Sequence, residues 1–343
     1  MTLQEVLIGL NDLTEEEKQV VKSRLVSRFY YPGKSVDEYL ADERFSHGLH
    51  CIHCGSTKIR RMGHTPQGAQ RYHCRDCNRT FGDRSGSVLS GTQKDVSVWE
   101  TYVDCMLEGL SLRKTAARCG INPNTAFMWR HKLLDSLREV LSSQTVGGVV
   151  EADETYLNVS YKGNHSGKTS FCMPRKSRHR GGELHQSGIS KELVCISCAV
   201  SRDGGSLSSA LTLGRASAKE LGTFFDGKLE EGSVLCTDHE PAYHSFAKKE
   251  GIRHIQLETK EVREGFMIQR VNAYHSRLHA FLSGFRGVST KYLDNYLAWN
   301  TAREMIRTKG ESEEALLIAK VLLSEGEKTY AQVKDRPAVP AGG

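Results

Sequence analysis

The sequence lacks any apolar run long enough to cross a membrane. Its longest apolar stretch, Ala315 to Leu323, is interrupted by Lys320, whereas a spanning helix needs about 20 consecutive apolar residues. The N-terminus has no basic flank followed by an apolar stretch, so we expect no signal peptide. No repeat of fixed period is visible, and only 38% of the 343 residues are hydrophobic. The sequence therefore predicts a soluble, intracellular chain with two or three modest domains of about 100–200 residues each.

Charge and cysteine usage narrow the class of protein. Lysine and arginine number 47 against 41 acidic residues, a formal net charge of +6, which favours a polyanion such as nucleic acid as the partner. The ten cysteines include two closely placed Cys-x-x-Cys pairs. This pattern is typical of metal binding in a reducing compartment and argues against a secreted disulfide framework.

The two pairs lie in residues 49–84, a stretch with little helical periodicity. Their spacing lets two turns converge on one tetrahedral ion, so we predict a zinc ribbon with structural Zn²⁺; the ligands are Cys51, Cys54, Cys74 and Cys77. A redox dithiol is the alternative function, and His53 and His73 are alternatives for one of the ligands. Arg71 and Arg75 belong to a dense set of cations around the ribbon, which indicates contacts with a DNA backbone or a solvated charged face.

Residues 95–142 have the pattern of a helix-turn-helix domain. A first helix ends at Gly120, and Asn122 with Pro123 marks the start of the second. We expect the second helix to turn an outward face to a DNA major groove. The predicted contacts are Arg113 and Lys114 on the first helix and Asn124, Thr125, Met128, Arg130 and His131 on the second. An ordinary helical hairpin is the alternative.

Strands and helices alternate after residue 146. Predicted strands cover residues 149–157, 193–200, 206–213, 233–237 and 253–257, and predicted helices cover 217–229, 241–249 and 267–282. Three strands followed by alternating helices and strands is the element order of a ribonuclease H-like core. Cys195 and Cys198 repeat the Cys-x-x-Cys spacing within a strand, where residues three apart point to opposite faces, so we interpret them as small buried hydrophobes.

Two aspartates mark strands that are neighbours in such a core. Asp153 interrupts the first buried strand and Asp238 ends the fourth. A buried carboxylate is costly unless a cation compensates it, and hard oxygen ligands suit Mg²⁺. Each aspartate taken alone could equally be a turn or cap residue.

Together these segments resemble the ISXO-like transposases of the insertion sequence 1595 family. The resemblance runs from about residue 30 to 305 and is most specific over residues 271–278 and 285–299. It implies a ribonuclease H-like transposase that binds terminal inverted repeats, cuts the element ends with two Mg²⁺ ions, and joins the 3′-hydroxyls to target DNA. The same resemblance implies that Mn²⁺ can substitute for Mg²⁺. It also implies double-stranded DNA as partner, a homodimer or larger synaptic assembly, no membrane, and a bacterial, cytoplasmic, nucleoid-associated location.

The resemblance assigns Asp153 and Asp238 as the first two acids of the catalytic triad. The third position falls on Asn272 rather than the usual glutamate, with His275 one helical turn on as a further ligand or proton acceptor. Rival third acids are Glu154, Glu258, Glu261 and Glu264, of which Glu154 is disfavoured because a neighbouring strand residue faces the other way. Arg277 and Lys291 are further candidates for phosphate contacts.

The whole chain is thus expected to combine α+β and α/β domains. Its expected parts are an N-terminal helical segment at 1–48, the zinc ribbon at 49–84, the helix-turn-helix at 95–142, a mixed-sheet catalytic domain at 146–310, and a C-terminal helix with a disordered tail at 311–343. Two other functions remain open: a sequence-specific DNA-binding regulator derived from a transposase, and a ribonuclease H-like nuclease.

Overall fold

The computed structural model describes residues 14, 41–42, 44–46, 48–65, 69–164, 172–174, 186, 188–309, 318, 321–322 and 330–339. Most of the predicted N-terminal helical segment lies outside these residues. The chain divides into two compact units: one covers residues 1–110, 118–120 and 314–325, the other residues 111–117, 121–313 and 326–343. Among the described helices, none is long and apolar enough to cross a membrane.

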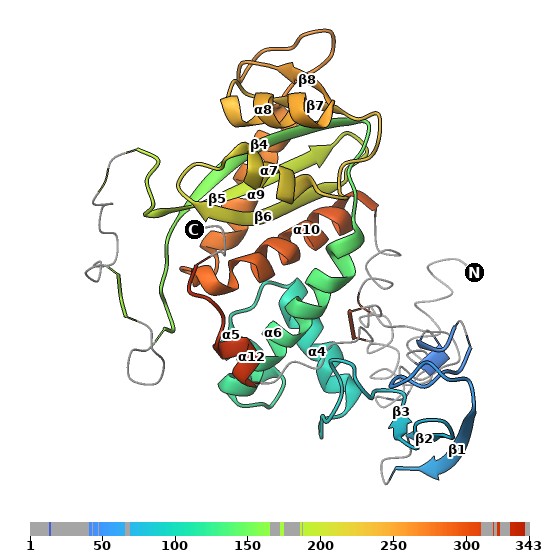
Figure 1. Ribbon diagram of the computed structural model, residues 1–343. Helices are drawn as coiled ribbons and strands as arrows, with labels where there is room; N and C mark the ends of the chain where they lie inside the picture. Colours follow the sequence, from blue (N-terminus) through green and yellow to red (C-terminus); the bar gives the residue numbers. More distant parts are fainter. Residues whose placement is uncertain are drawn as a thin grey trace. The chain divides into compact units, whose positions relative to one another are not determined.

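The first unit contains a small antiparallel sheet (Figure 1). Its strands, β1 (Ile59–His64), β2 (Gln70–Cys74) and β3 (Thr80–Gly82), are paired in that order. Tyr72 stacks on Phe81 above two buried cysteines, Cys51 and Cys74. So small a cluster provides little apolar burial, as expected for a module that depends on metal ligation. The helix α4 (Val96–Leu107) follows, capped by Asp95, whose side chain accepts from the backbone of Ser97.

The second unit is built on a mixed five-stranded sheet. The strands are β4 (Val149–Asn158), β5 (Leu193–Ser201), β6 (Ser206–Leu213), β7 (Val234–Thr237) and β8 (Arg253–Gln256), in the order β6-β5-β4-β7-β8. The first three are antiparallel, whereas β7 runs parallel to β4 and β8 runs parallel to β7. This order and these directions confirm the expected ribonuclease H-like core.

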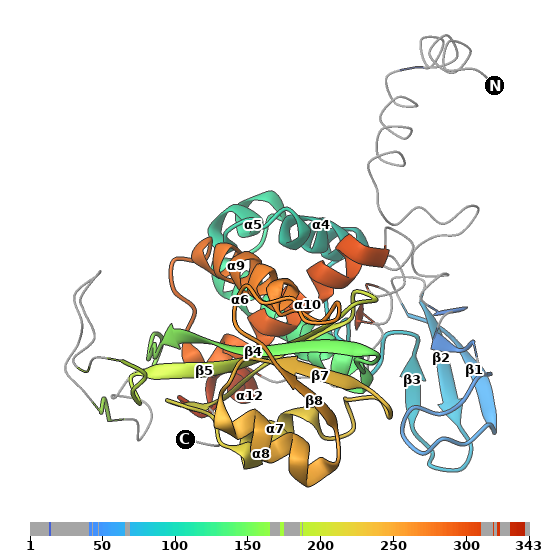
Figure 2. The same ribbon diagram turned by 90° about the horizontal axis from the view of Figure 1, so that it is seen from above.

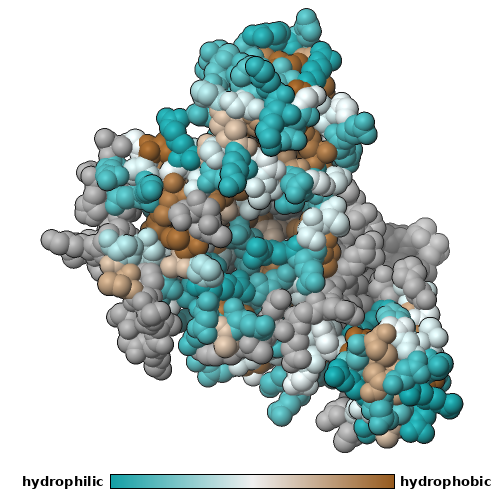
Figure 3. Space-filling view, viewed as in Figure 1, coloured by the Kyte–Doolittle hydropathy of each residue, from teal (hydrophilic) through white to brown (hydrophobic). Residues whose placement is uncertain are grey.

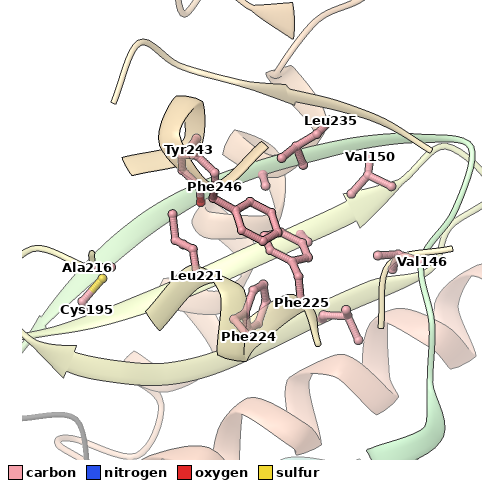
Figure 4. Close-up of a cluster of buried hydrophobic side chains, with 13 residues drawn as sticks. Val146, Val150, Cys195, Ala216, Leu221, Phe224, Phe225, Leu235, Tyr243 and Phe246 are labelled. Carbon is pink, nitrogen blue, oxygen red and sulfur yellow. The ribbon is translucent and has the colours of Figure 1, made fainter. Parts of the chain in front are cut away.

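Helices cover both faces of this sheet (Figure 2). On one face α7 (Ala218–Phe225) and α8 (Pro241–Glu250) enclose an apolar core in which Phe225 stacks on Phe246 beside Val150 and Leu235 (Figure 4). The other face is covered by α9 (Gln269–Ser283) and α10 (Leu293–Lys309). Cys195 and Cys198 are fully buried in β5, which confirms their interpretation as small hydrophobes.

The helix α7 is shorter than the sequence predicts. It ends at Phe225, not near residue 229, because Asp226 leaves helical geometry with a ψ of 118° and Gly227 adopts a φ of 64°. The remaining elements of this unit are α5 (Leu112–Arg118), α6 (Pro123–Val140), the short 3-10 turns η1 (Leu141–Ser143) and η2 (Thr290–Tyr292), and α12 (Tyr330–Lys334).

Candidate functional site

The two candidate aspartates lie side by side on neighbouring strands, Asp153 in the middle of β4 and Asp238 directly after the end of β7. In the parallel pairing of β4 and β7, Glu151 lies opposite Cys236, and Asp153 and Asp238 each follow two residues later. Burial first, and the charge of Asp238 second, raise the pKa of Asp153 to about 6. Among the described residues neither carboxylate has a lysine or arginine in an ion pair, so a divalent cation would relieve their repulsion.

The helix α9 lies along the same face of β4 and meets it at three positions. Glu151 accepts hydrogen bonds from the backbone N–H groups of Arg270 and Val271, His275 approaches Asp153, and Thr155 bonds His279 at 2.6 Å. The strand partners are spaced by two residues, about 6.6 Å, and the helix partners by four, about 6.0 Å. Because these rises nearly match, helix and strand stay in register over the whole contact.

His275 of α9 approaches the first of the two aspartates. Its Nδ1 lies 3.9 Å from Oδ2 of Asp153, and its Nε2 is buried with no hydrogen-bond partner among the described residues. Burial, and then the neighbouring His279, lower the pKa of His275 to about 4. The ring is therefore neutral at pH 7, with a lone pair available to a metal or a proton.

Asn272 lies one turn before His275 on the same helix. The hydrogen bonds described for it involve its backbone: its N–H donates to Ile268 and its carbonyl accepts from Ser276. Its assignment as third ligand therefore stays a prediction, whereas His275 has a contact with Asp153. The ligand atoms of Asp153, Asp238 and His275 are not all within 4.8 Å of one another; in the described chain, only the four-cysteine group gathers so closely.

The rival acids occupy other positions. Glu154 lies against Tyr243 of α8, on the opposite face of β4 from α9, as the strand alternation predicts. In the loop before α9, Glu261 is bound by Arg263, and Glu258 approaches His239, the residue after Asp238, at 3.6 Å. Glu264 is exposed in the same loop.

The four cysteines of the first unit form a preorganised metal site. The sulfur atoms of Cys51 and Cys77, and those of Cys54 and Cys74, are each 3.6 Å apart, and all four lie within 4.8 Å of one another. A tetrahedral zinc with bonds of about 2.3 Å needs sulfurs about 3.8 Å apart. Backbone N–H groups of Cys77, and then Asp76, lower the pKa of Cys74 to about 6, whereas burial, and then the neighbouring thiols, raise the pKa values of Cys54 and Cys77, so thiolate character is favoured at Cys74.

The neighbouring histidines have other partners. His73 bonds Asn78 and Arg60, and His53 packs edge-on against Phe81, so the four cysteines stay the predicted ligands. Arg71 and Arg75 are exposed on this module. Hydrophilic side chains predominate on its visible surface (Figure 3).

The helices α5 and α6 have the predicted boundaries of a helix-turn-helix. Gly120 has a φ of 59° in the turn, and the side chain of Asn122 caps α6 by accepting from the N–H of Asn124 at 2.8 Å. The exposed predicted contacts are Arg113, Lys114 and Asn124, and Thr125 and Met128 are half-buried. The N-terminal part of α6 therefore remains available to a DNA groove.

The outward orientation predicted for Arg130 and His131 is wrong. Each is only 1% exposed, because the middle of α6 packs against α10 and the segment that precedes it. The guanidinium of Arg130 lies over the rings of Trp299 and Phe285 at 5.4 and 6.0 Å. His131 stacks on Tyr292 and accepts a hydrogen bond from the side chain of Asn295.

The buried His131 should make stability depend on pH. Burial, and then the positive charges of Arg336 and Arg130, lower its pKa to about 3. Since its pKa is about 6.5 in the unfolded chain, stability is complete above pH 6.5 and falls as the pH decreases. At pH 5 the expected loss is about 2 kcal/mol.

Urea unfolding at pH 7 and pH 5, followed by tryptophan fluorescence, measures this loss. The pH dependence should become shallower in His131→Gln and stay as in wild type in His244→Gln, which changes an exposed histidine. An unchanged pH dependence in His131→Gln would contradict the assignment.

Two further predicted phosphate contacts have partners within the chain. Arg277 binds Glu304 at 2.8 to 2.9 Å, and Glu304 also binds Arg307. The amine of Lys291 donates to the backbone of Lys334 and lies over the ring of Tyr292. These contacts favour a structural role for Arg277 and Lys291.

The sequence indicated no role for the buried Glu151 and identified only Asp153 as a functional acid of the first strand. Two acids spaced by two residues in a strand share a face, and this spacing was the available signal. The acceptor role of Glu151 was not visible, because its partners lie on α9, far along the chain.

The chain is similar in sequence to proteins of transposable elements. Residues 145–301 match the family described as the ISXO2-like transposase domain. An uncharacterized protein in transposable element ISH50 of Halobacterium salinarum is 23% identical over 79% of this chain and 91% of its own length. The insertion element iso-IS1N protein InsA of Shigella dysenteriae is 30% identical over 22% of this chain and 81% of its own length.

Among solved structures, a pre-cleavage Mos1 transpososome and the Mos1 strand transfer complex are similar at 10% identity. Each comparison covers 94% of this chain and 96% of the other, with TM-scores of 0.26 and 0.27. The strand order and strand directions of the five-stranded sheet establish the ribonuclease H-like fold.

Proposed function

Because the chain belongs to the ISXO2-like transposase family, we propose that it is an active DNA transposase. It binds the terminal inverted repeats of its element, hydrolyses the phosphodiester bond at each end, and transfers the 3′-hydroxyl ends to target DNA. The observation that carries this proposal is the pair Asp153 and Asp238, which lie side by side on two parallel strands, in the middle of β4 and directly after β7, without a lysine or arginine partner among the described residues.

The donor set at this pair fits Mg²⁺ or Mn²⁺. Asp153 and Asp238 offer carboxylate oxygens, and α9 adds the imidazole of His275 or the amide oxygen of Asn272. When bound there, two such ions supply activation of the attacking oxygen and stabilisation of the leaving oxygen. His275 is neutral at pH 7 because of its low pKa, so it can bind a metal or accept the proton of the attacking hydroxyl.

We propose two DNA-binding surfaces, one on the N-terminal part of the helix-turn-helix and one on the zinc module. Side chains at the start of α6 would read base edges, and cations on α5 and on the ribbon would contact phosphates. The proposed set is Asn124, Thr125 and Met128, with Arg113, Lys114, Arg71 and Arg75. Zn²⁺ in the four-cysteine site would hold the ribbon's fold. Because a transposase acts on two DNA ends, the working form would be a dimer or larger assembly.

Base recognition by α6 can be tested by substitution. Asn124→Ala should weaken binding to the element ends about tenfold, the effect of losing one base contact, and should leave binding to unrelated duplex unchanged. Arg113→Ala should weaken both and reduce the salt dependence of binding. Fluorescence anisotropy with the two duplexes measures these changes. Equal losses on both duplexes in Asn124→Ala would contradict base recognition.

The activity itself is tested with labelled duplexes that carry the DNA flanking the gene. Incubation with Mg²⁺ or Mn²⁺ should nick the duplex at the repeat end and join the new 3′-hydroxyl to a second duplex. Cleavage without joining would favour a ribonuclease H-like nuclease. Tight binding without cleavage under either metal would favour a DNA-binding regulator.

A further inference from the structure

The helix α9 begins without a cap of its own. Its N-cap residue is Ile268, which makes no side-chain hydrogen bond, and its first turn contains no acidic residue. The first N–H groups of a helix need acceptors, and an isoleucine side chain offers none.

Glu151 of β4 supplies the missing acceptor. Its Oε2 accepts hydrogen bonds from the N–H groups of Arg270 at 2.7 Å and Val271 at 3.3 Å. The residue is fully buried, and its Oε1 has no hydrogen-bond partner among the described residues. A buried carboxylate is costly, and its charge is favourable here because it faces the positive end of the helix dipole.

The residue that caps α9 also shares a strand face with the first candidate aspartate. Glu151 and Asp153 are two residues apart on β4 and therefore lie on the same face. Their α9 partners, Val271 and His275, are one helical turn apart. The matching rises of strand and helix make these contacts interdependent, since a shift at the cap also moves His275 relative to Asp153.

From this geometry we infer that Glu151 is a positioning residue of the reaction centre: it caps α9 from β4 and so fixes the α9 ligand opposite Asp153. This inference rests on the proposed function for its catalytic consequence. Glu151 acts through α9 and does not itself contact DNA. Misplacement of a reacting group by about 1 Å can reduce a rate about a hundredfold, so loss of the cap is expected to slow cleavage 10- to 100-fold.

Three variants separate capping from general stability. Glu151→Ala removes the acceptor, whereas Glu151→Gln keeps an oxygen that can accept from the same N–H groups. Asp294→Ala is the matched control, because Asp294 of α10 also accepts a backbone N–H from another element, that of Ala210 in β6 at 2.9 Å.

The first measurement is a double-mutant cycle on cleavage rate. It combines each variant with His275→Ala or Asn272→Ala, whichever alone gives the larger loss. Glu151→Ala should add less than about threefold to that loss, because both changes disable the same group, whereas the loss from Asp294→Ala should multiply with it. Glu151→Gln should cleave within about threefold of wild type.

The second measurement is amide hydrogen exchange in the protein without DNA or metal. In Glu151→Ala the N–H groups of Arg270 and Val271 should exchange at least tenfold faster, and in Asp294→Ala at the wild-type rate. If wild type does not cleave any DNA end, the proposed function fails and exchange alone decides whether Glu151 anchors α9.

Three results would overturn the inference. These are full multiplication of the Glu151→Ala and α9 losses, cleavage by Glu151→Gln as slow as by Glu151→Ala, and unchanged exchange at Arg270 and Val271. Absence of any cleavage defect in both α9 variants would also overturn it, because α9 would then carry no group that needs positioning.

Discussion

Asp238→Asn should lower metal-dependent cleavage of the element ends by about a thousandfold or more. The substitution keeps the size of the side chain but removes the negative charge that a divalent cation needs beside Asp153. Affinity for the repeat DNA should stay within about twofold, because Asp238 is not in the proposed DNA-binding set. Single-turnover cleavage in Mg²⁺ and in Mn²⁺, with anisotropy on the same duplex, measures both quantities.

Asp226→Asn is the matched control for this experiment. Asp226 is exposed just after α7 and lies away from the aspartate pair, so its cleavage rate should equal that of wild type. Asp153→Asn should be as defective as Asp238→Asn. Full cleavage by either asparagine variant would remove the pair from the site, and with it the observation on which the proposed function depends.

The third ligand can be identified in the same assay. His275→Ala is expected to lose more activity than Asn272→Ala, because the structure gives only His275 a contact with Asp153. If Asn272→Ala kept full cleavage while Glu261→Ala or Glu264→Ala abolished it, we would withdraw the assignment of Asn272.

Removal of zinc should unfold the ribbon. The apolar cluster around Tyr72 and Phe81 is small, and structural zinc contributes about 10–16 kcal/mol of apparent binding energy in modules of this kind. Cys74→Ser should therefore release the metal and expose the residues of β1 to β3 to proteolysis. The ribonuclease H-like sheet is in the other unit, so its hydrogen-exchange protection should be retained.

Zinc content and limited proteolysis are the measurements for this prediction. Cys172→Ser is the control, since Cys172 is exposed and lies outside the four-cysteine group, and it should keep one zinc per chain. A wild-type protein that is folded over residues 49–84 yet contains no metal would disprove the structural role.

Much of the fold could be predicted because it follows from local patterns. The predicted limits of β6 agree with the structure, as do the cap at Asn122 and the turn at Gly120. Alternation in β4 also placed Glu154 correctly on the face opposite Asp153.

The errors and omissions concern contacts between distant parts of the chain. Arg130 and His131 look like surface residues on an isolated α6, and aromatic side chains from a distant part of the chain bury them: Phe285 after α9, Tyr292 of η2 and Trp299 of α10. Likewise, nothing near Ile268 in the sequence indicates that a strand residue caps α9. Periodicity predicts which residues share a face, but it does not predict which element covers that face.

The packing of α6 on α10 bears on where a bound DNA end would be cut. Arg130 and His131 pack α6 into the same compact unit that contains Asp153 and Asp238, so the proposed base contacts of α6 would lie at a fixed distance from the proposed cleavage site. Inserting one base pair between the recognised bases and the cleavage point turns the duplex by about 35°. Element ends with this insertion should still bind. They should be cut at the original distance from the recognised bases, which moves the cut by one base pair relative to the original cleavage sequence.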